Sequence, residues 1–143
     1  MDFFDESGAA AVEFALVLPM LAMLMCGIFS FSIALNNNEM LTGAVNTGAR
    51  QLARSRGAST PYADIVTLVG QAAAGLEPSK LSVTMTVNGQ SCTGDSGDSG
   101  CAALLTVGAP ASVTASYPCA IVVLGIDYAP NCTLSQTMTG RVE

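Results

Sequence analysis

Residues 14–29 read FALVLPMLAMLMCGIF and contain no polar side chain. The stretch without a charged residue continues to Asn38. A helix over residues 14–38 would be about 37 Å long, and the hydrocarbon core of a bilayer is roughly 30 Å thick. Its apolar residues would cover every side of the helix rather than one stripe, which is typical of a membrane span or a bundle core. We therefore expect a transmembrane helix at about residues 14–35, because a chain of 143 residues leaves too little to surround a buried helix.

The composition argues against several classes of function. The chain has 5 Lys plus Arg, 11 Asp plus Glu and no His, for a formal net charge of −6. The absence of histidine removes the commonest general base and the commonest metal ligand. An acidic pI of about 4.3 is unsuited to nucleic acid, which selects basic surfaces. The sequence therefore predicts no enzyme, no catalytic residue, no metal, no cofactor and no nucleic-acid partner.

Glu13 is an acidic residue next to the apolar stretch, and its spacing from Gly8 is informative. A cut after Gly8 would give Ala9 a free α-amino group, one helical turn before Glu13. The carboxylate would then pair with this ammonium group or with that of a neighbouring subunit, which offsets the cost of a charge in a membrane segment. The simpler alternative is that Glu13 marks the membrane edge.

Residues 8–19, GAAAVEFALVLP, resemble the N-terminus of the TadE-like pseudopilins. These proteins are minor components of the tight-adherence (Flp) branch of bacterial type IV pili. The resemblance covers roughly residues 7–56, and residues 134–143 more loosely resemble the last strand of the family. A glycine, four small or apolar residues, Glu, an aromatic residue and a Pro-containing span form a fairly specific motif.

The resemblance implies a processing site and a set of partners. A prepilin peptidase would cut between Gly8 and Ala9, and Glu13 with Phe14 would belong to the recognised motif. The partners would be the inner membrane, the prepilin peptidase, other pilin or pseudopilin subunits and the pilus assembly platform. The chain would cross the bacterial inner membrane once, with its C-terminal domain exported to the periplasm or carried on an extracellular pilus.

The charges around the span favour the opposite orientation. The leader, residues 1–8, carries Asp2, Asp5 and Glu6 instead of the basic residues usual in the family. A positive-inside count of the arginines after residue 49 would also place the C-terminal domain in the cytoplasm. We nevertheless expect an exported domain, because its cysteines require an oxidising compartment.

Pro19 lies inside the expected span and lacks the N–H that would bond the Ala15 carbonyl. We expect a kink or a loosened turn at this point. Two interpretations remain open: a loosened segment that helps the subunit leave the bilayer, or a kink that membrane helices simply tolerate.

The remaining chain predicts a small α+β domain. After the helix of residues 9–56, Thr60 as N-cap and Pro61 begin a second helix that ends near Gly75. Alternating apolar residues then predict a strand at residues 81–87 that ends at the turn Asn88-Gly89. Further strands are expected at residues 104–107, 111–117 and 134–142, and the apolar run 120–126 is ambiguous. The predicted organisation is a leader (1–8), a pilin helix (9–56) and an exported domain with a short helix and an antiparallel sheet (57–143).

Four cysteines fall in this domain: Cys92, Cys101, Cys119 and Cys132. Their even number in a small domain predicts two disulfides. Three pairings are possible, and we favour Cys92 with Cys101 and Cys119 with Cys132, since each pair closes a short loop rich in Gly, Ser, Asp or Pro. Neither spacing suits the usual zinc ligand pairs. The acidic glycine loop at residues 93–100 lacks EF-hand spacing and is expected to be solvated rather than to bind Ca²⁺.

The favoured function is that of a minor pilin that associates through its apolar helix. The alternative is a single-span envelope protein whose exported domain binds a ligand or partner without joining a filament. A secreted domain released after Ala34 is a third possibility, because Ser32-Ile33-Ala34 offers a small-x-small cleavage site.

Overall fold

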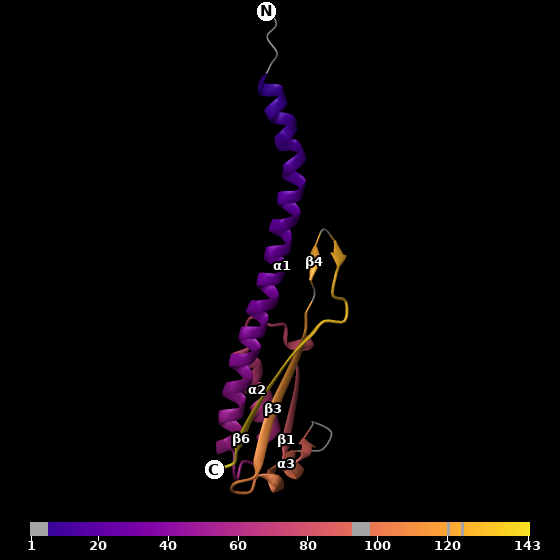
Figure 1. Cartoon of the computed structure of the whole chain (residues 1–143). Coiled ribbons are helices and arrows are strands. Elements are labelled where there is room, and N and C mark those ends of the chain that lie inside the picture. The colour runs from indigo at the N-terminus through magenta and orange to yellow at the C-terminus, as the bar shows by residue number, and fades with distance from the viewer. Residues whose placement is uncertain (1–5, 93–97, 120, 124) are drawn as a thin grey trace, which may run out of the picture.

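A long N-terminal helix and a small four-stranded sheet organise the protein (Figure 1). The computed structural model describes residues 6–92, 98–119, 121–123 and 125–143. The elements are α1 (Glu6–Arg54), α2 (Pro61–Ala72), the 3-10 turn η1 (Pro78–Lys80), β1 (Ser82–Val87), β2 (Gln90–Cys92), α3 (Asp98–Leu104), β3 (Pro110–Pro118), β4 (Val122–Val123), β5 (Ile126–Asp127) and β6 (Thr133–Arg141). The α+β prediction is therefore confirmed.

The main sheet has the order β2-β1-β3-β6, and all its neighbouring strands are antiparallel. Asn88 and Gly89 both have positive φ and connect β1 to β2, as a tight hairpin requires. The period-two pattern of β1 buries Met85 and Val87, and β3 alternates in the same way. The strands expected at residues 81–87, 111–117 and 134–142 are thus confirmed as β1, β3 and β6.

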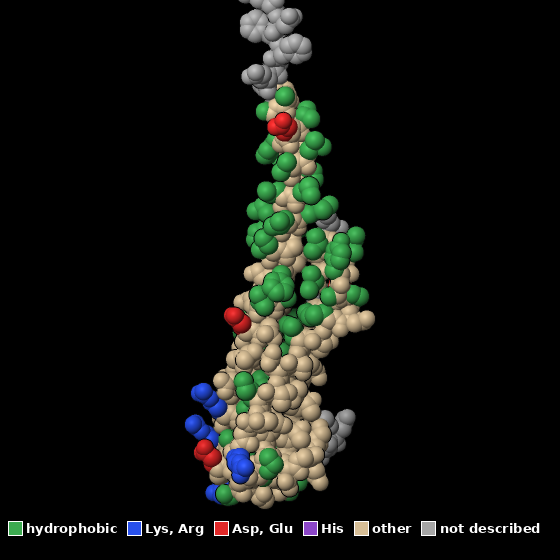
Figure 2. Space-filling view, in the orientation of Figure 1, with side chains coloured by type: hydrophobic (Ala, Val, Ile, Leu, Met, Phe, Trp, Pro, Cys, Tyr) green, Lys and Arg blue, Asp and Glu red, His purple; other side chains and the backbone are tan. Residues whose placement is uncertain are grey.

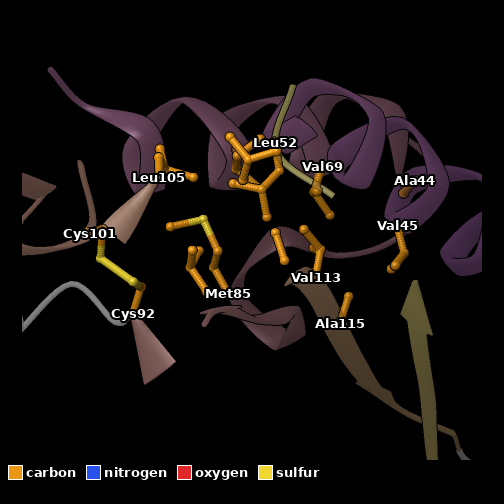
Figure 3. Packing of buried hydrophobic residues seen from close by; sticks show 14 of the residues in the cluster. Ala44, Val45, Leu52, Val69, Met85, Cys92, Cys101, Leu105, Val113 and Ala115 are labelled. Carbon is orange, nitrogen blue, oxygen red and sulfur yellow. A yellow bond between two sulfur atoms is a disulfide. The ribbon is translucent and has the colours of Figure 1, made fainter. Parts of the chain in front are cut away.

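The core lies between the C-terminal part of α1, the short helix α2 and one face of the sheet (Figure 3). The first buried residue of α1 is Leu41, and Leu52 is the last in the helix. The fully buried side chains facing one another include Leu41, Val45, Leu52, Ile65, Val69, Met85, Val87 and Val113. The C-terminus joins this core through the buried Val142 and through Glu143, whose N–H donates to the Ala53 carbonyl at 2.8 Å.

Gly48 allows α1 and α2 to approach closely. A Cβ atom at position 48 would lie 2.6 Å from Cγ2 of Val69 and 3.6 Å from Cγ1 of Val113. Val69 is fully buried and its β-branched side chain is stiff, so it cannot turn away cheaply. At Gly43, five residues earlier in α1, an added Cβ atom would meet no atom within 4 Å.

We expect Gly48→Ala to destabilise the domain by about 1–3 kcal/mol, because overpacking outweighs the better helix propensity of alanine. Gly43→Ala is the matched control, and it should leave stability unchanged or raise it by up to about 1 kcal/mol. Urea unfolding of the detergent-solubilised chain measures both effects. Equal unfolding midpoints for the two variants would contradict this account of the α1–α2 contact.

The strand expected at residues 104–107 is wrong. Residues 98–104 form α3, and Leu105 follows it as a buried core residue. The side chains of Thr106 and Val107 are both exposed, so the segment has no alternation of buried and exposed positions. Cys101 and Leu105 are four residues apart, so a helical turn places both side chains on the side that faces the core.

The N-terminus of α2 is capped by a residue distant in sequence. Thr60 is at the predicted N-cap position, but its side chain makes no capping hydrogen bond. Instead, Oδ1 of Asp98 accepts hydrogen bonds from the backbone N–H groups of Tyr62 at 2.7 Å and Ala63 at 3.2 Å. A carboxylate at this end also complements the helix dipole. The cap therefore ties α3 to α2.

Candidate functional site

The N-terminal half of α1 presents apolar side chains to its surroundings on every side (Figure 2). Every residue from Gly8 to Met25 is exposed, with Phe14 at 67% and Met20 at 75%. Fifteen large apolar side chains are exposed along this part of α1: Val12, Phe14, Leu16, Val17, Leu18, Met20, Leu21, Met23, Leu24, Met25, Ile28, Phe29, Phe31, Ile33 and Leu35. By length and composition, α1 is a helix that could cross a membrane.

Glu13 is exposed within this apolar surface, one turn along the helix from Ala9. Among the residues that the structure describes, the ion pair found joins Lys80 to Glu77, and Glu13 has no cation within reach. A carboxylate surrounded by apolar side chains would be costly in lipid or in a filament without a partner. A Glu13 inside the apolar layer would need a partner from a new N-terminus or from another molecule, whereas a Glu13 at the membrane edge would need none.

The other predicted residues of this segment lie along the same continuous helix. Gly8 and Ala9 lie in its first turns and are exposed, and Phe14 follows on the exposed surface. The helix runs through Pro19 without a break in its assignment. Because proline has no N–H, the Ala15 carbonyl lacks its usual intrahelical donor. The leader residues Met1–Asp5 lie outside the described residues.

A second apolar feature lies beside α1, and the sequence did not predict it. The ambiguous run at residues 120–126 contributes β4 and part of β5, which pair as a hairpin apart from the main sheet (Figure 1). The Ser30 hydroxyl donates to the Val122 carbonyl at 2.7 Å, which fixes the hairpin against the helix. On α1, the half-buried positions Cys26, Gly27, Ser30 and Ala34 recur on one side at helical spacing.

The two disulfides hold different parts of the domain. Cys92 is bonded to Cys101 with Cα atoms 5.7 Å apart, and both side chains are buried in the core (Figure 3). Cys119 is bonded to Cys132 with Cα atoms 5.1 Å apart, and this bond closes the base of the β4–β5 hairpin. These are the favoured pairings. Of the acidic glycine loop, residues 93–97 lie outside the described residues, and Asp98 begins α3.

A hollow separates the hairpin base from α1. It is lined by Ile33 and Asn37 of the helix and by Lys80, Tyr117 and Asp127 of the domain, among others. The Lys80 ammonium group hydrogen-bonds and pairs with Glu77 at 2.6 Å, which raises the pKa of Lys80 and lowers the pKa of Glu77. Both groups are well exposed, so this pair contributes little to stability.

The surface formed by the described residues suits association with other apolar surfaces. They contain no group of three or more His, Cys, Asp or Glu side chains that could hold a metal ion. The prominent surface is a long apolar helix, with Glu13 near the start of its apolar part and an apolar hairpin beside it. Such surfaces pack against lipid or against other apolar helices.

Comparison with known proteins finds a similarity in the N-terminal part of the chain. No curated protein and no solved structure matches the chain. The model of the family described as TadE-like protein matches residues 8–50. This match begins at Gly8, includes Glu13 and ends within the part of α1 that enters the core. The resemblance expected from the sequence is therefore confirmed over residues 8–50: this segment of α1 is similar to the TadE-like family, which suggests an association with the Tad pilus.

Proposed function

We propose that the protein is a minor pilin of the Tad/Flp type, made as a membrane-anchored precursor and assembled through α1. The observation that carries this proposal is the fully exposed, all-round apolar helix of residues 8–25, with Glu13 in register with Gly8 and inside the TadE-like match. A soluble single-chain protein would not leave such a helix uncovered. In this proposal, the domain that follows modifies, caps or primes the filament.

The free energy gained by moving the apolar side chains of α1 out of water supports a function in association. Moving one large apolar side chain out of water is worth about 1.5–3 kcal/mol. Fifteen such side chains are exposed along residues 12–35 of α1, so the total is on the order of tens of kcal/mol. Lipid satisfies this demand in the precursor. Neighbouring apolar helices satisfy it equally in a filament, so a subunit exchanges lipid contacts for protein contacts at little net cost.

The proposed orientation places Gly8 on the cytoplasmic side and the sheet domain in the periplasm. The two disulfides support this orientation, because such bonds persist in oxidising compartments. A cytoplasmic prepilin-peptidase site would cut between Gly8 and Ala9 and remove three acidic side chains, which changes the formal charge from −6 to −3.

N-terminal sequencing of the membrane-bound protein tests this function. We expect the mature chain to start at Ala9 in cells that contain a prepilin peptidase and at Met1 in matched cells without one. A start at Met1 in both strains would identify an unprocessed single-span anchor and contradict the pilin proposal. A start at Leu35 would identify a secreted domain and would also contradict it.

A further inference from the structure

We propose that the β4–β5 hairpin, residues 119–132, is a second membrane element that enters the outer leaflet beside α1. The inference rests on the proposed membrane anchoring of α1 and adds a lipid-binding surface on the exported domain. The occupant of this surface is the acyl-chain region of the bilayer near its periplasmic face. The family match at residues 8–50 does not include the hairpin.

The position of the hairpin along α1 determines how deep the hairpin would lie in the bilayer. About 20 helical residues cross the hydrocarbon core, so a span that begins at Phe14 ends near Ile33. Ser30 then lies about 5 Å inside the apolar layer. Because the Ser30 hydroxyl donates to the Val122 carbonyl at 2.7 Å, Val122 must lie at nearly the same depth. In Figure 1 the hairpin points toward the N-terminal end of α1, so the pair of Val123 and Ile126 lies deeper than Val122.

The side chains of the hairpin suit this depth. Residues 118–126 contain no charged residue. Val122 is 47% exposed and Ile126 is 59% exposed, although nothing in a water-soluble domain would require these apolar groups at a loop tip. Figure 2 shows hydrophobic side chains gathered on both the hairpin and the adjacent helix. The two elements together form one apolar surface.

The polar groups of the hairpin follow directly after Ile126. Tyr128 is 67% exposed, as expected of an aromatic residue in the headgroup layer. Asp127 is the cross-strand partner of Val122, but it lines the hollow with Asn37 and Lys80, and its Oδ1 accepts a hydrogen bond from the Ala129 N–H at 2.9 Å. The insertion is therefore shallow, with Val123 and Ile126 in the acyl chains and the Asp127 carboxylate at their boundary with the headgroup layer.

The backbone of the hairpin also fits a layer without water. Peptide groups there need internal partners, because unsatisfied groups cost several kcal/mol in hydrocarbon. Val122 pairs with Asp127 and Val123 with Ile126, and the Tyr128 N–H donates to the Ile121 carbonyl at 3.0 Å. Ser30 satisfies the Val122 carbonyl and explains a polar residue just after the apolar stretch 14–29.

Single-tryptophan variants test the insertion, because the natural chain contains no Trp. Ile126→Trp reports on the hairpin, Phe29→Trp on the membrane span and Val107→Trp on an exposed residue of the sheet domain. Each full-length variant is reconstituted at low protein-to-lipid ratio into phosphatidylcholine vesicles with and without brominated acyl chains. Tryptophan emission and its quenching by bromine are measured, and near-native disulfide pairing is verified for each variant.

We expect bromine to remove most of the emission of I126W and F29W and little of that of V107W, with a blue-shifted maximum for the first two. Quenching of F29W without I126W would overturn the hairpin inference and leave the anchor in place. If F29W is not quenched, the membrane anchor and the hairpin inference both fail. Protection of I126W from both brominated lipid and aqueous acrylamide would show that a second copy covers the hairpin, which also overturns the inference.

Discussion

Glu13→Ala should abolish pilus formation while the protein remains in the membrane at normal abundance. In the proposed assembly, the carboxylate pairs with the α-amino group that cleavage after Gly8 creates at Ala9. The two positions are four residues apart in a continuous helix, so their groups share one side of it. The pair, within one helix or between neighbouring helices, would neutralise both charges in a low-dielectric environment, where an unpaired charge costs several kcal/mol.

The effect of the Glu13 charge can be separated from the effect of its side-chain size by a second variant. Glu13→Gln keeps the size of the side chain but cannot neutralise an ammonium group, and it should fail as the alanine variant does. Glu39→Ala is the matched control, because Glu39 is the next acidic residue of α1 and is also exposed. Electron microscopy of cells and sedimentation of sheared filaments measure assembly.

N-terminal sequencing of the Glu13 variants separates two ways in which assembly can fail. A chain that starts at Ala9 but forms no pili has lost the charge pair. A chain that still starts at Met1 has lost recognition by the peptidase, the other function that the family resemblance assigns to Glu13 and Phe14. Normal pili from the Glu13→Gln variant would contradict the charge-pairing mechanism.

The sequence predicted the elements whose patterns are local. The apolar run at residues 14–29 indicated the long helix, and the alternation in residues 81–87 indicated β1, because burial on one or all sides leaves a regular period. The pairing of Cys92 with Cys101 was favoured on the length and composition of the loop that it closes, and the structure has this bond. The family match covers residues 8–50 and so extends into the part of α1 that is buried in the core.

Features that depend on distant contacts left no such pattern. Asp98 caps α2 from more than 30 residues away, and no local motif connects the two segments. The helix α3 was missed because its seven residues are too few to establish a period. The contact between Ser30 and Val122 joins residues 92 positions apart, so the hairpin appeared in the sequence only as an apolar run of uncertain type.

Removing the core disulfide should produce the largest loss of stability that we predict. Cys92 and Cys101 are each only 1% exposed and belong to the main hydrophobic cluster. The bond closes a loop with a sequence separation of 9 residues. Chain entropy alone then gives a destabilisation of about 2.6 kcal/mol for the double variant Cys92→Ala/Cys101→Ala. Loss of buried sulfur from the core adds to this cost.

The hairpin disulfide provides a matched control of similar loop length. Cys119 and Cys132 have a sequence separation of 13 and lie at the base of the β4–β5 hairpin, apart from the main sheet. Because this hairpin packs mainly on α1, it can open locally while the sheet domain stays folded. Cys119→Ala/Cys132→Ala should therefore shift the main unfolding transition less than the core variant does, and Cys26→Ala should not shift it.

Urea unfolding of the full chain in detergent, followed by circular dichroism, distinguishes the three cysteine variants. The core variant should unfold at a clearly lower urea concentration, because its free energy of unfolding falls by a large part of the 5–15 kcal/mol typical of small domains. Equal shifts for the core and hairpin variants would mean that the hairpin unfolds together with the sheet. In that case the hairpin is an integral part of the domain core, and its contact with Ser30 would be needed for folding rather than only for its position at the membrane.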